Sequence, residues 1–147
     1  MAVNPAGKPQ GCTHYKLRQL VREVSHYYDT EIGKAGLKGT QYALMGHVRK
    51  LGPVRLSDLA REMRLDASTL TRNLKPLTEA GWLRVEVGAD GRSRLVTITE
   101  AGLAKYSEAQ RYWKRAQERI NQLFGAEQVI VLHELIDELL ARLPQRS

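Results

Sequence analysis

The sequence predicts a mainly α-helical fold with one small β-hairpin. Apolar residues recur every three or four positions over most of the chain, which is the spacing of a buried helix face. Over residues 83–87 the spacing changes to every second residue, and after the turn pair Asp90-Gly91 a second run, over 95–98, is rich in β-branched residues. With 147 residues and 42% hydrophobic content, the chain can form one compact domain with a buried core.

Spacing and end signals place the outer helices. Residues 1–12 carry prolines and glycines without an apolar run, and we expect a flexible N-terminal arm there. Helices are expected over residues 13–32 and 41–51, and Gly52-Pro53 ends the second of them. After the hairpin, apolar spacing predicts two further helices within residues 100–143. A single domain over residues 13–147 would contain all of these elements.

Two short helices in the middle of the chain are joined by a break of a few residues. The first is expected over residues 56–64, where Ser57 can cap it. Asp66 is suited to cap the second, over residues 67–80, and Gly81 ends it. Helices joined so tightly cross at a steep angle. Together with the hairpin that follows, this segment predicts a winged helix-turn-helix lobe over residues 40–99.

The second of these short helices has one apolar and one polar face. Leu70, Leu74 and Leu77 recur at helical spacing and should point inward. Hydroxyls and long cations then lie on the opposite face, and the base edges and phosphates of DNA accept hydrogen bonds from both. An ordinary amphipathic surface helix would show the same pattern, and the adjoining hairpin is what favours DNA binding. The outward residues are Ser68, Arg72, Lys75 and Glu79, with Thr71 beside them.

Arg92 and Arg94 lie near the turn of the predicted hairpin. Because they are two residues apart, both should project from the same face. A guanidinium in this place can enter a minor groove, where narrow A·T tracts concentrate negative potential. A lone hairpin would more simply carry these arginines as solvated surface charge.

The net charge of +7 and an isoelectric point near 9.8 favour a polyanionic partner. Charge alone would also fit RNA or an acidic membrane surface. The basic residues form no lysine-rich tract, however, and no segment has the two faces of a membrane-surface helix. Without a predicted signal peptide or membrane span, the chain is expected to be cytoplasmic. One cysteine and no Cys/His spacing predict neither a disulfide nor a zinc site, and no cofactor is indicated.

Several short pieces of sequence occur in a set order. They are Gly36-Leu37 followed by Thr40-Gln41-Tyr42, Leu59-Ala60, Leu70-Thr71-Arg72 with Leu77 and Gly81-Trp82, and Asp90-Gly91-Arg92 followed by Ile98-Thr99 and Gly102. Each piece is weak alone, but in this order and spacing they resemble the MarR family of winged-helix bacterial regulators. The resemblance runs from about Leu17 to the last helix.

The resemblance implies roles for individual residues at the DNA. The helix over residues 67–80 would face the major groove, Arg92 would be the arginine of the wing tip, and Asp90 would hold the wing in shape. Pro76 lies inside that helix, where a proline costs about 3 kcal/mol in isolation, so the packing of Leu74 and Leu77 must offset it. The predicted DNA-binding residues are Ser68, Thr69, Thr71, Arg72, Lys75, Asp90, Arg92 and Arg94.

The last predicted helix is too apolar for a single buried stripe. A terminal helix in a chain of this size has few neighbours of its own, although a central core helix would have the same composition. We therefore expect a homodimer built from residues 13–32 and 100–143. Its two recognition helices would meet double-stranded DNA at a pseudo-palindromic operator with half-sites about one helical turn, ~34 Å, apart.

The resemblance also implies a small effector. In that family, small aromatic or phenolic acids often bind between the dimerisation helices and the winged lobe and release the protein from DNA. Such a ligand needs aromatic walls and one cation for its carboxylate. Aromatic residues and histidines are more often ordinary core or surface residues than ligand contacts. The candidate contacts are His14, Tyr15, Arg18, Tyr28, Tyr42, His47, Tyr112 and Trp113.

Cys12 raises the alternative of a thiol-based redox-sensing regulator. A branch of the family senses peroxides through one cysteine near the start of the first helix, but counting without gaps puts that place on His14. Arg18 occupies the place of one of the tyrosines that assist it. Lys16, Arg18 and the helix start could still favour a thiolate at Cys12.

No enzyme is predicted from the motifs. The chain has no evident serine, histidine and acid set and no glycine-rich phosphate loop, and His133-Glu134 lacks the second histidine of a zinc motif. A winged helix used only for protein contacts is a further alternative, because the same fold serves both purposes. The expectation is a ligand-responsive transcriptional regulator, and more often a repressor within the family resembled.

Overall fold

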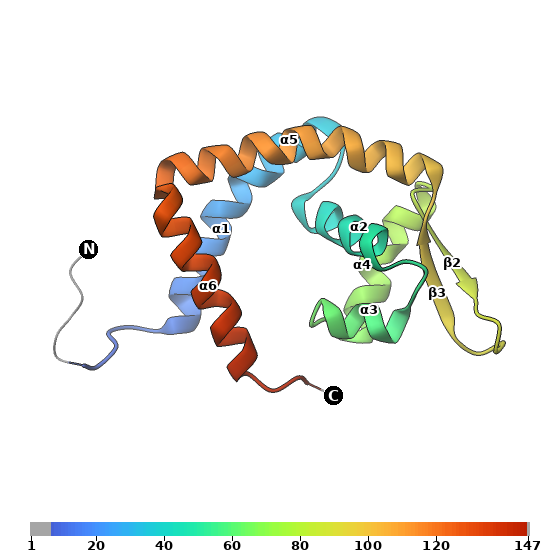
Figure 1. The fold of residues 1–147 in the computed structure, drawn as a ribbon, viewed down its shortest axis with the longest axis horizontal. Helices are drawn as coiled ribbons and strands as arrows, with labels where there is room; N and C mark the ends of the chain where they lie inside the picture. The colour runs from blue at the N-terminus through green and yellow to red at the C-terminus, as the bar shows by residue number, and fades with distance from the viewer. Residues whose placement is uncertain (1–6, 147) are drawn as a thin grey trace.

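Figure 1 shows the computed structural model, which describes residues 7–146. The helices are α1 (Thr13–Ile32), the short 3-10 helix η1 (Gly33–Ala35), α2 (Gly39–Leu51), α3 (Leu56–Glu62), α4 (Ala67–Glu79), α5 (Glu100–Phe124) and α6 (Ala126–Arg142). The strands are β1 (Val54–Arg55), β2 (Leu83–Val87) and β3 (Arg94–Ile98). The predicted mainly α-helical fold with a small β wing is confirmed. Of the expected N-terminal arm, residues 1–6 lie outside the described residues.

The long helix α5 joins two parts of the molecule (Figure 1). Helix α1 packs along α5, and α6 turns back from the far end of α5 after Gly125. At the other end of α5, the winged lobe consists of α2, α3, α4 and the sheet. The helix-turn-helix is therefore attached to the outer helices mainly through α5 and through the contacts of α2 with α1 and α5.

The sheet has three antiparallel strands in the order β1-β3-β2. Its register pairs Val54 with Val96 on one side of β3 and Leu83 with Ile98 on the other. Strand β1 was not predicted, because two residues are too few to show an alternating pattern. The alternation over residues 83–87 correctly indicated a strand but not a buried face, since Leu83 is buried whereas the side chain of Val87 is 54% exposed.

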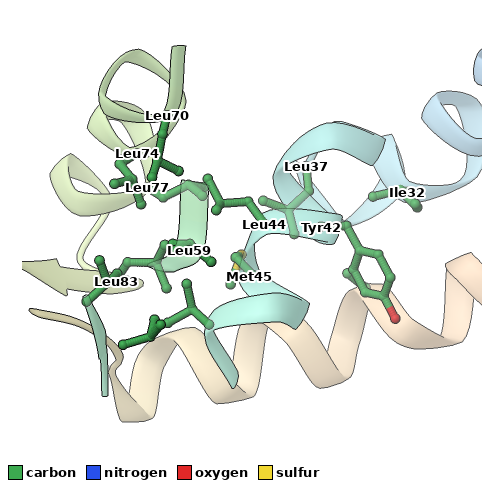
Figure 2. Packing of buried hydrophobic residues seen from close by; sticks show 14 of the residues in the cluster. Ile32, Leu37, Tyr42, Leu44, Met45, Leu59, Leu70, Leu74, Leu77 and Leu83 are labelled. Atoms are coloured by element: carbon green, nitrogen blue, oxygen red, sulfur yellow. The ribbon is translucent and has the colours of Figure 1, made fainter. Parts of the chain in front are cut away.

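The hydrophobic core lies within the winged lobe and extends to the end of α1. Figure 2 shows Leu44 and Met45 of α2 between the buried leucines of α4 and the helix α5. Leu59 of α3 and Leu83 of β2 close the same cluster. Among the described residues no polar or charged residue is fully buried, so apolar packing holds the helix-turn-helix on α2 and α5.

Helices α1 and α6 carry much of their apolar surface on the outside. The predicted excess of apolar surface on the last helix is confirmed, since Val129 is the buried residue of α6. The exposed large apolar residues of these two helices are Tyr15, Leu17, Leu20, Val21, Ile130, Val131, Leu135, Ile136, Leu139 and Leu140. Within residues 7–146, no helix combines the length and the apolar character needed to cross a membrane.

Candidate nucleic-acid interface and adjoining cavity

Helix α4 separates its apolar and polar residues as its spacing predicts. Leu70, Leu74 and Leu77 are buried in the core of the lobe. The structure leaves Ser68, Thr71, Arg72 and Lys75 exposed, whereas Thr69 is half-buried. Pro76 does not break the helix, which continues to Glu79. The buried leucines on both sides of the proline thus keep α4 one continuous helix, and its polar face is continuous as well.

The first turn of α4 is held by the cap that the sequence predicts. The Asp66 carboxylate accepts hydrogen bonds from the Thr69 backbone N–H at 2.7 Å and from the Ser68 hydroxyl at 2.8 Å. These bonds lower the pKa of Asp66 to about 2, because they stabilise its charged form. Arg72 Nη2 donates to the Thr69 hydroxyl at 3.3 Å. Thr69 therefore supports the cap and Arg72, while Ser68 and Thr71 stand on the exposed surface.

The wing turn is organised by one carboxylate. Asp90 Oδ1 accepts hydrogen bonds from the backbone N–H groups of Ser93 and Arg92 at 2.9 and 3.0 Å, and from the Ser93 hydroxyl at 2.8 Å. These contacts, those of Ser93 first, lower the pKa of Asp90 to about 2. Gly91 has a φ of 73°, which a glycine adopts without strain. The result is a tight turn that leaves the Arg92 side chain exposed.

Arg94 is also exposed, but strand alternation does not relate its direction to that of Arg92, contrary to the prediction from sequence. Strand β3 begins at Arg94, which pairs with Val87, so Arg92 lies in the turn and outside the alternating strand. The two arginines are close in sequence and both reach solvent. Their relative directions are set by the Asp90 turn and not by strand periodicity.

A cavity of about 810 Å³ lies between the winged lobe and the outer helices. Its walls come from α1, α2 and α5, with Glu62 from the end of α3. The rings of Tyr42 and Tyr106 are stacked, with centroids 4.7 Å apart and planes 1° apart. The guanidinium of Arg49 lies 4.9 Å from the centroid of the Tyr106 ring. The cavity thus has an aromatic wall with a cation against it.

Two of the phenols that line this cavity, those of Tyr28 and Tyr42, have raised pKa values and are neutral at physiological pH. Burial, together with the hydrogen bond to Tyr106, raises the pKa of Tyr42 well above its usual value, and burial raises the pKa of Tyr28. The Tyr28 hydroxyl donates to the side-chain carbonyl of Gln117 on α5. Neutral phenols can both donate and accept hydrogen bonds, which suits a ligand with phenolic or carboxylate oxygens.

The structure brings together half of the predicted ligand contacts. Tyr28, Tyr42, His47 and Trp113 line the cavity. His14, Tyr15 and Arg18 are exposed on the first turns of α1 and do not line it. Tyr112 is next to Trp113 in sequence, but successive helical residues point about 100° apart, and Tyr112 instead packs under Arg115.

Sequence reasoning missed Arg49, Tyr106 and Gln110, which also line the cavity. Helical spacing in the sequence could have placed these residues on the same helix faces as the predicted contacts. Gly46 and Arg49 follow Tyr42 by four and seven residues on α2, and Gln110 and Trp113 follow Tyr106 by the same steps on α5. Each set forms one helix face, and Gly46 leaves the room that the Tyr106 ring occupies, since a Cβ there would lie 3.3 Å from it.

Cys12 is exposed and occupies the position directly before α1. It does not belong to the cavity lining. Within the described part of the chain, no group of three or more His, Cys, Asp or Glu side chains is placed to hold a metal ion.

Comparisons with known proteins agree with this geometry. The model of the MarR family matches residues 35–93. The uncharacterized HTH-type transcriptional regulator YwoH of Bacillus subtilis is 28% identical over 94 residues, covering 64% of this chain and 69% of YwoH. YxaD, described in the same words and from the same organism, is 28% identical over 129 residues, which cover 80% of this chain and 88% of YxaD. The structure of the M. tuberculosis transcriptional regulator MosR in complex with DNA superposes with a TM-score of 0.74 at 26% identity, over 90% of this chain and all of MosR.

Proposed function

Because the chain belongs to the MarR family of DNA-binding transcriptional regulators, we propose that it acts as a dimeric repressor that leaves its operator when a small aromatic acid or phenol binds. The observation that carries this proposal is the tyrosine-walled cavity with Arg49 at its side, placed between the DNA-reading lobe and the outer helices. The proposed unit is one domain over residues 13–147, with the winged lobe at 40–99.

The exposed residues of α4 and the wing support the proposed DNA contacts. Ser68, Thr71, Arg72 and Lys75 would enter the major groove, where hydroxyls, guanidinium and ammonium groups meet base edges and phosphates. Arg92 and Arg94 would reach the neighbouring minor groove. Thr69 and Asp66 support the first of these surfaces, as Asp90 supports the second. MosR, whose structure is a complex with DNA, supports this assignment by similarity.

The apolar surface of α1 and α6 supports the proposed dimer. Side chains such as Leu135 and Leu139 remain 47% and 45% exposed in the single chain, on a helix whose length offers a continuous surface. A second copy related by a twofold axis would cover the same surface on both chains. The two α4 helices would then lie on the same side of the DNA. They would bind a pseudo-palindromic operator whose half-sites are about one turn of the double helix apart.

The cavity would couple ligand binding to the spacing of the two recognition helices. Its walls include α1 and α5 from the outer helices and α2 and Glu62 from the winged lobe. A ligand that binds more tightly to one arrangement of the winged lobe and the outer helices shifts the population of molecules toward that arrangement. Its volume of about 810 Å³ is within the range of small-molecule sites, roughly 300–1,000 Å³.

The test is binding of the purified protein to the intergenic DNA upstream of its own gene, followed by fluorescence anisotropy at several salt concentrations. Affinity should fall steeply with salt. Arg72→Ala should weaken operator binding by about 1 to 3 kcal/mol and relax base preference, whereas Lys75→Ala should weaken operator and random duplexes alike. A salt-independent interaction would instead indicate a protein-contact module.

The effector is tested in the same assay with a panel of aromatic carboxylates and, separately, with peroxide. Aromatic acids should release the wild type from DNA. Arg49→Gln should remove this response and leave DNA affinity in place, while Arg111→Gln, a charge-matched change outside the cavity, should respond like the wild type. Release by peroxide, abolished in Cys12→Ser, would support thiol sensing and contradict the proposed effector.

A further inference from the structure

A second, small groove lies where the start of α2 meets α4. Its volume is about 150 Å³, and it is lined by Lys38, Thr40, Gln41, Arg72, Asn73 and Pro76. Among these described residues two are cations, three are neutral polar residues and none is acidic. The larger cavity differs in this respect, since Asp29 and Glu62 are part of its lining. The composition of the small groove therefore favours an anion.

Lys38 is an unfavourable residue for the place it occupies. It is the N-cap of α2, with φ −92° and ψ 157°. Helix N-caps favour Ser, Thr, Asp or Asn, whose side-chain oxygen accepts a backbone N–H, and an ammonium group has no lone pair to offer. A cation also lies unfavourably at the positive end of a helix dipole. Such a local conflict is expected where a residue serves function and not stability.

Two backbone N–H groups at this helix start have acceptors within the chain. Gln41 Oε1 accepts the Lys38 N–H at 2.9 Å, and Asp29 Oδ1 accepts the Gly39 N–H at 2.7 Å. Within residues 7–146 neither Lys38 nor Arg72 takes part in a salt bridge, although Asp66 lies near enough to Arg72 for their charges to attract. The lining of the groove therefore brings together two cations with no carboxylate of the described chain in direct contact with either of them.

Arg72 connects this groove to the DNA-reading surface, because its side chain belongs to the exposed face of α4 and also lines the groove. We propose that the groove binds a phosphate of the DNA backbone beside the major groove read by α4, with Lys38 as the principal cation. This rests on the proposed function as a DNA-binding regulator. A phosphate contact of this kind fixes the position of the helix without reading bases.

The primary experiment compares Lys38→Gln with Lys34→Gln. Both changes lower the net charge by one, but Lys34 is already paired with Glu31 at 3.0 Å and does not line the groove. Dissociation constants are measured against salt for operator and random duplexes. Lys38→Gln should lower the slope of log K against log salt by about 1, which corresponds to about 8-fold weaker binding at 0.1 M salt on both duplexes. Lys34→Gln should leave the slope close to that of the wild type.

Two more variants separate binding from folding. Lys38→Ser places a preferred cap at the start of α2, so its melting temperature should rise while its DNA affinity falls as in Lys38→Gln. Lys38→Arg should keep the salt slope, since the charge remains. A loss of DNA affinity that follows a loss of stability would overturn the assignment, because it would indicate a structural role.

The outcomes also distinguish a failure of the proposed phosphate site from a failure of the proposed function as a DNA-binding regulator. If the wild type binds DNA with a salt slope and Lys38→Gln behaves like Lys34→Gln, the groove holds no phosphate and the regulator proposal stands. If the wild type shows no salt-dependent DNA binding, the proposed function itself fails.

Discussion

Asp66 and Asp90 each use one carboxylate to shape a surface of the winged lobe. Asp66 holds the first turn of α4 through Thr69 and Ser68, and Asp90 folds the wing turn through Ser93 and Arg92. Both carboxylates accept hydrogen bonds in their charged form, which is the reason for their low pKa values of about 2. The exposed arginines thus depend on neighbouring acidic residues for their placement.

The Asp66 cap makes the free energy of unfolding depend on pH in the acidic range. Its pKa is lowered from 3.8 to about 2 in the folded protein, so its contribution is complete above about pH 4 and is lost as the pH falls through about 2. Asp66→Asn keeps an oxygen that can accept the Thr69 N–H but does not titrate. The stability advantage of the wild type over Asp66→Asn should therefore shrink between about pH 4 and pH 2, as measured by urea unfolding at each pH.

Asp90 titrates in the same range in both proteins, so its effect cancels in that difference. Asp66→Ala provides the second comparison, because it removes the cap at every pH and should be less stable than Asp66→Asn at neutral pH. A constant difference between wild type and Asp66→Asn down to pH 2 would contradict the role given to the carboxylate.

At the scale of elements, the start of α5 is packed directly against the chain that leads into the wing. The Thr99 hydroxyl donates to the Gly81 carbonyl at 2.6 Å and accepts the Gly102 N–H at 3.0 Å. Thr99 N–H donates to the Trp82 carbonyl at 3.0 Å. This short network joins the long helix to the end of the helix-turn-helix, so the lobe and α5 are connected at a defined angle.

Position 102, where α5 packs against the backbone of Trp82, requires a glycine. A Cβ on this residue would lie 2.0 Å from the Trp82 carbonyl oxygen and 2.8 Å from Ile98 Cγ1. Gly102→Ala should therefore destabilise the fold by about 3 kcal/mol or more, since backbone atoms cannot move aside cheaply. Gly33→Ala is the control, because its Cβ would meet open space at a φ of −58°, and a gain of about 0.4 to 1 kcal/mol is expected. Equal unfolding midpoints for the two variants would contradict this packing.

Local sequence rules predicted most elements to within a residue or two. Asp66 begins α4 as expected, and Thr99 begins α5 in the same way, because a capping side chain bonds a backbone N–H three residues away. Ser57 was wrong as a cap, since α3 begins at Leu56 with Arg55 before it. The start of α3 follows directly on β1, and the pairing of β1 with β3 is a long-range contact that local rules do not contain.

At the scale of the whole molecule, the apolar surfaces of α1 and α6 lead to a prediction about assembly. Leu135 and Leu139 are one helical turn apart and both exposed. The double change Leu135→Glu and Leu139→Glu should give a folded monomer, because burying two carboxylates in a dimer interface is costly and exposing them in a monomer is not. Analytical ultracentrifugation gives the mass, and circular dichroism gives the fold.

Val87→Glu is the matched control for the double change. Its side chain is an apolar group exposed to a similar degree, 54%, but lies on the wing, away from α1 and α6. This variant should remain a dimer. The monomer should also lose its preference for a palindromic duplex over a single half-site, and a dimer that persists in the double variant would place the interface elsewhere.

The cavity and the groove show where prediction from sequence ends. Helical spacing identifies Tyr42, Gly46 and Arg49 as one face of α2, but not that this face packs against Tyr106 and Trp113 of α5 in the wall of a cavity. In the same way, Lys38 and Arg72 are 34 residues apart, and their shared groove appears when α2 and α4 are packed together. His14, Tyr15 and Arg18 had the right chemistry for a ligand, but they lie on the first turns of α1, outside the cavity lining.

Spacing, caps and turn residues were sufficient to derive the helices, the hairpin, the polar face of α4 and the excess of apolar surface on α6, because each depends on neighbours a few residues away. Which helix faces pack together when they are far apart in the sequence was decided by the tertiary structure. Arg64 illustrates the difference, since it adopts a φ of 53° in the turn between α3 and α4 and donates to the Leu140 carbonyl of α6 at 2.8 Å, across 76 residues of sequence. No local pattern encodes such a contact, because its free energy depends on how all the intervening elements fold.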